Sequence, residues 1–448
     1  MSLTVSVVIP AFNAAEQLRC CLEGLGRSTT PYVECIVVDD GSADETADIA
    51  RQFGARVLTT GGRRGPAIAR NLGAKAAQGD ILWFLDSDVS PYADTLGRIV
   101  RTFEEDPGLD ALIGSYDDSP ECQDFLSQYR NLMHCYVHQH GQRRACTFWS
   151  GCGAIRRNVF LEHAGFDESY RRPAIEDIEL GYRLCMTGRR VVLDKEILVK
   201  HLKRWTFWGL LKTDILDRGI PWTELILRDR HMPNDLNLEI SQRVSVALAF
   251  LLMAFTAAAA AFWGWYFLTP MMALLFMLLA PYWLELGQGP RSKSLPVVMG
   301  LLIGLMVWRA YAHRMIGVVP PLILAYLMLI LRHRYAYSDE RKRRLTGIVL
   351  GVYILGALVF MVTHLPAHML VFAVFVLAAV IVILNTQFYL FLAKKQGRLF
   401  ALAAVPFHLL YHLYNGISFV AGLAHFTWRS LFHKTARLAP ARRGHEPQ

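Results

Sequence analysis

The chain changes character near its middle, and this change limits what it can fold into. Up to about Gln242, charged and apolar residues are mixed as they are in soluble domains. From Val244 onward, long apolar runs are broken only by short basic clusters. A helix of about 20 apolar residues crosses a bilayer core of about 30 Å. At 448 residues each half is long enough to bury a core of its own. The sequence therefore predicts a soluble domain followed by an all-α membrane domain.

Six apolar runs of the second half predict membrane spans. They are residues 244–268, 270–286, 295–311, 315–331, 345–363 and 369–392. Counting alternately from a cytosolic N-terminal half places the basic clusters at 291–293, 332–344 and 394–398 on the inner side. Lys and Arg favour cytoplasmic loops, and only Arg309 and Arg314 depart from this pattern. The sequence thus predicts a multi-pass protein of the cell membrane with a cytoplasmic N-terminal domain.

A seventh apolar segment, 399–428, does not fit the alternating pattern. If it crossed the membrane, the basic tail at 429–448 would lie outside. The segment also contains Pro406, His408 and His412, which are unusual in a simple span. We therefore interpret it as an in-plane or re-entrant helix pair.

The basic charge of the chain does not indicate nucleic-acid binding, and the cysteine spacing does not indicate a C-x-x-C zinc or redox motif. Much of the formal net charge of +9 lies in short loops between apolar runs, so membrane lipids are expected as partners and nucleic acid is not. All eight cysteines lie in the N-terminal half, and no pair has C-x-x-C spacing. We expect reduced thiols that pack as small apolar side chains. The first strand starts almost at Met1 with no signal peptide before it, which agrees with a cytosolic location.

The N-terminal half alternates short strands with helical patterns. The predicted strands are 5–9, 35–38, 57–58 and 81–85. This alternation is typical of an α/β domain with a parallel sheet that is covered on both faces. The predicted domains are 1–204 for the α/β domain, 205–242 for amphipathic interfacial helices, 243–428 for the membrane domain and 429–448 for a basic tail.

Polar groups follow three of the four predicted strands. The first strand leads into Pro10-Ala11-Phe12-Asn13, the second into Asp39-Asp40, and the fourth into Asp86-Ser87-Asp88. Because ligands of such sheets bind beyond the carboxyl ends of the strands, we expect these groups to share one site. Asp86 and Asp88 can approach one hard cation, and Mg²⁺ or Mn²⁺ prefers such oxygen ligands and is commonly shared with phosphate.

Three further segments carry candidate functional groups. Arg70 follows a Gly- and Arg-rich loop that enters a helix, where guanidinium and amide groups bind phosphate well. Gly151 and Gly153 allow a backbone to approach a ligand closely. Glu176 and Asp177 begin an amphipathic helix, where they either cap the helix or accept a proton from a hydroxyl group.

A linker rich in Trp and Leu joins the two halves. Residues 205–230 alternate these apolar side chains with Asp, Lys and Arg. Trp205, Trp208 and Trp222 suit a helix pair that lies in the lipid head-group layer. Such a collar would bring the reactive head of a lipid-linked acceptor within reach of the soluble domain.

The ordered motifs of the N-terminal half resemble those of family 2 glycosyltransferases of the GT-A fold. They are VVIPAFN, VVDDGSADET, ARNLGAKAAQGDILWFLDSDV, WSGCGAIRR, IEDIELGYRL and HLKRW, over about residues 4–205. The resemblance implies a Rossmann-like GT-A domain with a mostly parallel sheet, a nucleotide-sugar donor and a divalent metal. UDP-sugar is the donor that it favours, with GDP-sugar as the alternative.

The resemblance also implies a role for each matching residue. The nucleotide contacts would be Pro10, Asn13, Asp39, Asp40, Arg70 and Asp86, with Asp40 preferred for the base or ribose. Asp86, Asp88 and His201 would hold the metal, although processive synthases have Gln where this chain has His201, and a structural histidine is the alternative. Asp177 would be the general base, with Glu176 beside it. Arg204, Trp205, Gly151 and Gly153 would face the diphosphate or the acceptor.

The implied reaction is an inverting transfer to a lipid or lipid-linked glycan at the cytoplasmic face. Asp177 would remove the proton of an acceptor hydroxyl, and would matter less if the acceptor is a phosphate. Two alternatives stay open. One is a processive polysaccharide synthase, which His201 disfavours, and the other is a transporter or scaffold with an inactive domain, which the intact acidic set disfavours.

Overall fold

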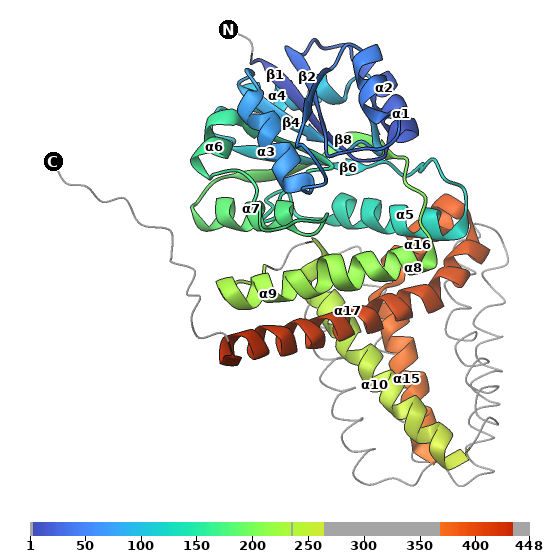
Figure 1. Ribbon diagram of the computed structural model, residues 1–448. Helices are drawn as coiled ribbons and strands as arrows, with labels where there is room; N and C mark the ends of the chain where they lie inside the picture. The colour runs from blue at the N-terminus through green and yellow to red at the C-terminus, as the bar shows by residue number, and fades with distance from the viewer. Residues whose placement is uncertain (1–2, 234–235, 264–367, 433–448) are drawn as a thin grey trace. The chain divides into compact units, whose positions relative to one another are not determined.

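The computed structural model describes residues 3–233, 236–263 and 368–432 (Figure 1). Its contacts divide the chain into two compact units. The first joins Met1–Val246 to Gln387–Gln448, and the second is Ala247–Thr386. The sequence assigned all of 243–428 to the membrane domain, whereas the structure groups residues 387–428 with the first unit. Both ends of the chain therefore contribute to the unit that holds the α/β domain.

One eight-stranded sheet forms the centre of the first unit, with strand order β3-β2-β1-β4-β7-β6-β8-β5. The strands are β1 (Val5–Ala11), β2 (Glu34–Asp39), β3 (Arg56–Thr59), β4 (Ile81–Leu85), β5 (Val89–Pro91), β6 (Ala111–Tyr116), β7 (Cys152–Arg156) and β8 (Val191–His201). The first four strands are those that the sequence predicted, within two residues of the expected ends.

The sheet is mixed, although its first half is parallel as predicted. Strands β1, β2, β3 and β4 pair in parallel. The second half departs from the prediction, because β7 is antiparallel to both β4 and β6, and β5 is antiparallel to β8. Only the pair β6 and β8 restores a parallel pairing. The core is thus a Rossmann-like half extended by antiparallel strands.

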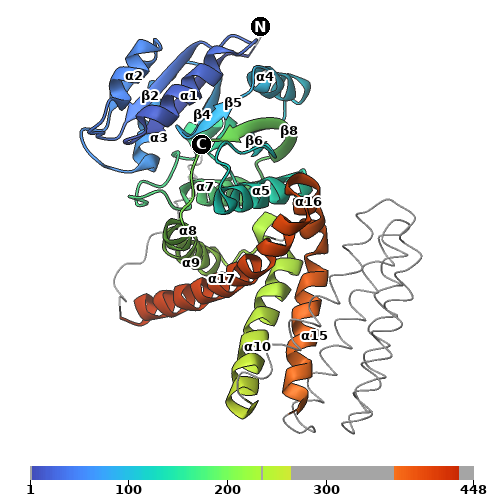
Figure 2. The ribbon, with the colours of Figure 1, turned by 90° about the vertical axis from the view of Figure 1, so that its right-hand side faces the viewer.

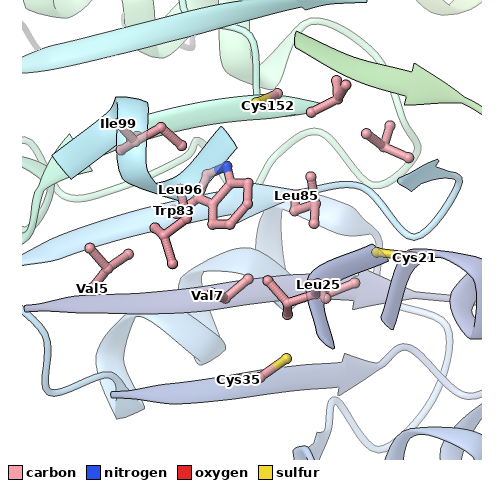
Figure 3. Packing of buried hydrophobic residues seen from close by; sticks show 14 of the residues in the cluster. Val5, Val7, Cys21, Leu25, Cys35, Trp83, Leu85, Leu96, Ile99 and Cys152 are labelled. Atoms are coloured by element: carbon pink, nitrogen blue, oxygen red, sulfur yellow. The ribbon is translucent and has the colours of Figure 1, made fainter. Parts of the chain in front are cut away.

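Helices cover both faces of the sheet because successive strand residues point to opposite sides. One face carries α1 (Ala15–Gly26), α2 (Thr46–Gln52) and α4 (Thr95–Glu105), and the other carries α3 (Pro66–Ala76), α6 (Arg157–Glu162) and α7 (Glu176–Met186). Figure 3 shows the first face, where Val7 of β1 and Leu85 of β4 lie near Leu25 of α1. This packing fixes the strand ends on which the polar groups lie.

Helix α5 (Phe125–His140) packs against β6 and β8 and begins at a clear cap. The side chain of Asp124 accepts a hydrogen bond from the backbone N–H of Ser127 at 3.0 Å. In both views α5 and α7 lie between the sheet and the next layer of helices (Figures 1 and 2). Helix α5 therefore has one side toward the sheet and another toward the linker.

The linker forms one helical path, which differs from the expected helix pair. It consists of α8 (Phe207–Lys212), a π-helical turn η1 (Thr213–Gly219) and α9 (Ile220–Asp229). Trp208 is exposed, but Trp205 is buried in the first unit, so only part of the predicted aromatic collar faces outward. The π-helical turn joins α8 directly to α9, without the separation that a helix pair would have.

The last described segment corrects a second prediction. Residues 399–428 form part of a single helix, α17 (Arg398–Phe432), with Pro406 inside it, and not a helix pair. A proline removes one backbone hydrogen bond, and α17 compensates by packing along α9 and η1. It follows α16 (Thr386–Gln396), from which it is separated by Gly397 at a φ of 88°.

The second unit contributes α15 (His368–Leu384) and most of α10 (Ile240–Trp263), which follows a short 3₁₀ turn at Leu236–Leu238. Ala373 and Leu377 of α15 pack against Leu248 and Leu252 of α10. Within the described ranges, one helix is long and apolar enough to cross a membrane, at Ile240–Ala257. The pair Phe372–Leu384 and Thr386–Gln396 would be another if both formed one broken span.

Of the six predicted spans, the structure describes residues of only the first and the last. The spans 270–286, 295–311, 315–331 and 345–363 lie outside the described residues. The span 369–392 is not one helix, because it is interrupted at Asn385. The side-chain amide of Asn385 donates to the carbonyl oxygen of Ile381 at 2.8 Å, and such side-chain bonds compete with the helical backbone.

The cysteine prediction is wrong for two of the eight residues. Cys146, in the loop before β7, is disulfide-bonded to Cys185 of α7, and the two Cα atoms are 5.3 Å apart. The other six cysteines are free thiols, as predicted. The bonded pair is 39 residues apart in sequence, and only the packing of this loop on α7 brings the two sulfur atoms together.

Candidate active site

The loops after β1 and β2 are joined by side-chain hydrogen bonds. Ala11 at the end of β1 lies beside Asp39 at the end of β2. Asn13, with a φ of 47°, accepts a hydrogen bond from the backbone of Ala43 and donates its own N–H to the hydroxyl of Ser42. Pro10 is buried within β1. These contacts hold the two predicted nucleotide-binding loops side by side.

The adjacent acids Asp39 and Asp40 have different surroundings. The buried carboxylate of Asp40 accepts hydrogen bonds from Thr60 and from the backbone N–H groups of Arg64 and Gly65, at 2.8 to 2.9 Å. Asp39 is only half-buried and accepts one bond, from the backbone of Ser42. Asp40 therefore shapes the Gly- and Arg-rich loop, and the geometry favours Asp39 over Asp40 as the ligand contact.

Arg70 of α3 joins two acidic groups that are far apart in sequence. Its guanidinium donates to Oδ1 of Asp86, after β4, at 2.7 Å and to Oε1 of Glu176, at the start of α7, at 2.8 Å. Its side chain is only 6% exposed, and that of Glu176 only 4%. The structure thus brings together residues of the predicted nucleotide, metal and catalytic groups.

The charges of this cluster do not balance. Burial raises the pKa of the Asp86 carboxyl, and Arg70 opposes that change. Burial likewise raises the pKa of Glu176, again against the effect of Arg70. One guanidinium faces these two carboxylates, and the charges of Asp88 and Asp177 also act on them. Such an excess of negative charge favours a bound cation.

His201, at the end of β8, lies opposite the second acid of the D-x-D motif. Its Nε2 is 3.7 Å from Oδ2 of Asp88, which is too long for a hydrogen bond. Burial alone would raise the pKa of Asp88, but the nearby His201 and the charge of Lys203 lower it to about 2. Asp88 therefore carries a full negative charge at neutral pH.

The ring of His201 is held from two sides. Its Nδ1 lies 2.5 Å from Oδ1 of Asn131 on α5, and its ring stacks on Tyr116 with centroids 4.2 Å apart. An amide oxygen only accepts, so Nδ1 must carry the proton. Nε2 then lies on the side of Asp88, and this is the orientation that a histidine metal ligand with an outer partner adopts.

The predicted metal ligands fit a divalent ion only in part. Asp88 and His201 offer one oxygen and one nitrogen to the same space, while Asp86 is engaged by Arg70. The three side chains do not converge within 4.8 Å in the described part of the chain. A cation would thus be held by Asp88 and His201 together with ligand oxygens, as is usual for ions shared with phosphate.

Asp177 is the more accessible acid of the pair at the start of α7. Its Oδ2 accepts hydrogen bonds from both the backbone N–H and the hydroxyl of Ser150, each at 3.0 Å. Asp177 is half-buried, whereas Glu176 is buried and bound to Arg70. The two neighbours therefore differ in environment: Glu176 is a buried partner of Arg70, and Asp177 is the acid that a ligand can reach more easily.

Protein atoms pack closely around Gly151 and Gly153. A Cβ atom on Gly151 would lie 2.7 Å from the ring of Trp149, and one on Gly153 would lie 2.5 Å from the backbone oxygen of Trp149. The backbone oxygen of Gly151 also accepts a bond from the N–H of Asp86. Both glycines thus place Trp149 and β7 next to the D-x-D motif.

Arg204 and Trp205 do not lie with the other predicted residues. Arg204 is 78% exposed at its side chain and reaches only Asp124, at 3.7 Å. Trp205 is buried and donates its backbone N–H to the hydroxyl of Ser127 on α5. Lys203 is among the groups that lower the pKa of Asp88, so it is the cation of this segment that acts on the site.

Three residues of the site were not predicted from the sequence. Asn131 holds His201, Ser150 holds Asp177, and Lys203 acts on Asp88. Ser150 and Lys203 lie inside motifs that were recognised, so their positions gave a signal. Asn131 lies on a helix without any motif, and only the fold reveals its partner.

Comparison with known proteins finds a family match in the N-terminal part of the chain. Residues 6–164 match the family described as glycosyl transferase family 2. Glycosyltransferase AglE of Haloferax volcanii is 39% identical over 120 residues, which are 25% of this chain and 39% of that protein. A PGL/p-HBAD biosynthesis glycosyltransferase of Mycobacterium tuberculosis is 38% identical over 115 residues, 24% of this chain and 45% of that protein. The chain spans less than half the length of these relatives.

Solved structures of similar proteins match more loosely. The mannosyltransferase PcManGT from Pyrobaculum calidifontis, in complex with GDP-Man and Mn²⁺, matches with a TM-score of 0.40 and 20% identity, over 51% of this chain and 63% of that one. Staphylococcus aureus TarS in complex with UDP-GlcNAc matches with a TM-score of 0.39 and 20% identity, over 50% and 64% of the two chains.

Proposed function

We propose that this chain, whose N-terminal half holds a glycosyltransferase family 2 domain, is an inverting, metal-dependent glycosyltransferase. It moves a sugar from a nucleoside diphosphate sugar to a membrane-associated acceptor, a lipid or a lipid-linked glycan, at the cytoplasmic face. UDP-sugar is the preferred donor and GDP-sugar the alternative.

One observation carries this proposal. Arg70 binds both Asp86 and Glu176, and this joins the D-x-D motif after β4 to the acidic start of α7. Donor binding and proton removal both need acidic groups near one another, because the sugar must lie between the diphosphate and the base. The half-buried Asp177 is next to Glu176 and faces Ser150.

In the proposed reaction, each residue does one task. Asn13 and Asp39 bind the nucleoside, since both lie at the ends of adjacent parallel strands. Arg70 holds Asp86 in place, and Lys203 contributes positive charge near Asp88. Asp177 accepts the proton of the acceptor hydroxyl as that oxygen attacks the anomeric carbon, and Ser150 keeps its carboxylate oriented.

A divalent cation would be held by Asp88 and His201. When bound, it would neutralise the charge of the departing diphosphate. Mn²⁺ suits an imidazole ligand better than Mg²⁺ does, since Mg²⁺ prefers oxygen. The stacking of His201 on Tyr116 and its bond to Asn131 keep the ring aimed at Asp88.

A membrane-associated acceptor is supported by the surface of the first unit. Large apolar side chains are exposed along α8, η1 and α17, among them Trp208 at 77%, Val420 at 59% and Trp428 at 61%. Helices with such a face bind at the lipid interface. Since α17 packs on α9 and η1 in the same unit as the catalytic domain, this face would hold the site close to lipid acceptors.

The test is a transfer assay with the full-length chain in native membranes. A panel of labelled UDP- and GDP-sugars is supplied with and without Mn²⁺, the lipids are extracted, and the length of any glycan product is measured. We expect label from one donor to enter the lipid fraction only with the metal, and Asp88→Asn to abolish it. Asp48→Asn, which changes an exposed acid paired with Arg51, is the matched control.

Three results would contradict the proposal. Transfer that is equal in wild-type and Asp88→Asn membranes would exclude the D-x-D motif from the reaction. Failure of every donor to label any product would leave an inactive domain, and a long polymer would instead identify a processive synthase.

A further inference from the structure

Three metal-binding side chains meet at a place away from the D-x-D motif. A sulfur of Cys146, a sulfur of Cys185 and a ring nitrogen of His231 all lie within 4.8 Å of one another. They come from three segments: the loop before β7, α7, and the connection that follows α9. In the described residues this is the only set of three such side chains that meets this closely.

His231 gives a second, independent sign of a ligand. Its Nε2 is buried and has no hydrogen-bond partner in the described structure. A buried polar atom without a partner destabilises the folded state, and a bound metal ion would satisfy it. The His231 ring also packs edge-on against Tyr182 of α7, with centroids 5.4 Å apart, which orients it.

We propose that Cys146, Cys185 and His231 form a zinc site, and that the disulfide in the structure is its oxidised, metal-free state. Two thiolates and one imidazole are a soft donor set that selects Zn²⁺ over Mg²⁺ or Mn²⁺. Three protein ligands leave one tetrahedral position for water. This site is distinct from the carboxylate site and does not depend on the proposed sugar transfer.

The two states interconvert by ordinary thiol chemistry. Two molecules of a thiol reductant reduce the Cys146–Cys185 bond to two thiols and leave as one disulfide. The two protein thiols then lose two protons as they bind Zn²⁺ together with neutral His231. Oxidation by a small disulfide, with uptake of two protons, re-forms the protein disulfide and releases Zn²⁺ and two small thiols.

The position of the site gives it a structural consequence. The loop that carries Cys146 also carries Ser150, and α7 carries both Cys185 and Asp177. The packing between them is tight, because a Cβ atom on Gly181 would lie 2.2 Å from the backbone of Phe148. Either the disulfide or the metal therefore joins the loop and helix that set the position of Asp177.

The test measures metal binding by the full-length chain in detergent. The protein is reduced with a phosphine without oxygen, the phosphine is removed, Zn²⁺ or Co²⁺ is added, and excess metal is removed before elemental analysis. We expect the reduced wild type to retain one more Zn²⁺ per chain than Cys146→Ser/Cys185→Ser. Co²⁺ should give the intense visible and thiolate charge-transfer bands of a tetrahedral thiolate site only in the wild type.

Matched variants separate this site from other metal binding. His231→Ala should weaken Zn²⁺ binding by roughly 100-fold, since it removes a ligand and not merely an outer partner. Cys20→Ser/Cys122→Ser removes two free, half-exposed cysteines elsewhere and should change nothing. Adding oxidised glutathione should release the extra Zn²⁺ and remove two titratable thiols.

A further measurement needs no variant and so does not depend on folding of the mutants. Zn²⁺ should slow alkylation of Cys146 and Cys185 in the reduced wild type, as read by peptide mapping, without protecting Cys20. The proposal is overturned if reduced wild type shows no extra zinc and no thiolate band relative to the double variant. It is also overturned if the oxidised protein binds zinc equally well, or if both cysteines are alkylated at the same rate with and without Zn²⁺.

Discussion

The side-chain oxygen of Asn131 lies 2.5 Å from Nδ1 of His201 and so fixes which ring nitrogen faces Asp88. Asn131 is on α5, 70 residues before its partner in the sequence. Through this contact, a residue outside the predicted ligand set orients the ring of the predicted metal ligand.

Replacement of Asn131 should weaken metal binding without unfolding the protein. We expect Asn131→Leu to lower the apparent affinity for Mn²⁺ by roughly 10–100-fold, because an outer partner of a ligand histidine is lost. Asn131→Asp keeps the acceptor and should retain most of the affinity. Mn²⁺ binding is measured by electron paramagnetic resonance, with Gln139→Leu on the same helix as the control. Equal affinity in Asn131→Leu and wild type would refute this role.

Loss of Arg70 should cost much of the stability of the first unit. Arg70→Met leaves the buried Glu176 without its cation, and breaking a buried pair from one side costs about 3–5 kcal/mol. Adding Glu176→Gln to that variant should recover part of the loss. Chemical denaturation of the purified chain measures the free energy of unfolding.

Arg98→Met is the matched control for this prediction. Arg98 pairs with Asp94 on the surface, where such pairs are worth about 0–1 kcal/mol. A similar loss of stability in both variants would show that the Arg70 contacts are no stronger than a surface pair.

Asp177→Asn should distinguish the two classes of acceptor. With a hydroxyl acceptor, loss of the general base should lower kcat by roughly 10²–10⁴-fold and leave donor binding unchanged. With a phosphate acceptor, which is already ionised, the effect should be much smaller. Steady-state kinetics with the donor that the transfer assay identifies measures both quantities, and Ser150→Ala should show a weaker effect of the same kind.

The stability of the first unit should fall in mild acid through His138 of α5. Burial lowers the pKa of His138 to about 4, although its hydrogen bond to the carbonyl oxygen of Gly114 favours the charged form. The unfolded chain has a histidine pKa of about 6.5, so it binds more protons than the folded chain between these values. The stability linked to His138 is therefore complete above about pH 6.5 and is lost as the pH falls to about 4, by about 3 kcal/mol in total.

His138→Asn tests this pH dependence, since its amide can still donate to Gly114. We expect the free energy of unfolding of that variant to vary less between pH 6.5 and 4.5 than that of the wild type. The neighbouring His134 also has a lowered pKa, because of burial and then the charge of His138, so some dependence will remain. An unchanged slope would show that His138 does not titrate in this range.

The parallel half of the sheet could be predicted from the sequence, because local apolar patterns determine its strands. The apolar runs at Val5, Cys35 and Ile81 became parallel strands β1, β2 and β4. The acids at their ends followed from the geometry of a parallel sheet. The antiparallel insertion of β7 next to β4 was not predictable, because it depends on pairing between segments about 70 residues apart.

The candidate site also has a part that motifs predict and a part that only the fold reveals. Asp86, Asp88 and Asp177 lie in recognisable motifs. The sequence could not say that Arg70 joins Asp86 to Glu176, which lies 106 residues after Arg70. It also could not separate Asp40, whose oxygens are occupied by a loop, from Asp39. Local rules misjudged Pro406 as well, because packing against α9 and η1 outweighs one lost hydrogen bond.

Tyr414 of α17 donates to the buried Asp214 of η1 at 2.7 Å, and Asp214 also binds Arg130 of α5 at the same distance. These bonds join the two separate parts of the first unit, between which the segment Ala247–Thr386 lies in the sequence. A fragment cut after α9 would leave Arg130 and Asp214 without Tyr414 and uncover the apolar side of α9. The smallest fragment that keeps these contacts must therefore contain both parts of the first unit, on either side of Ala247–Thr386.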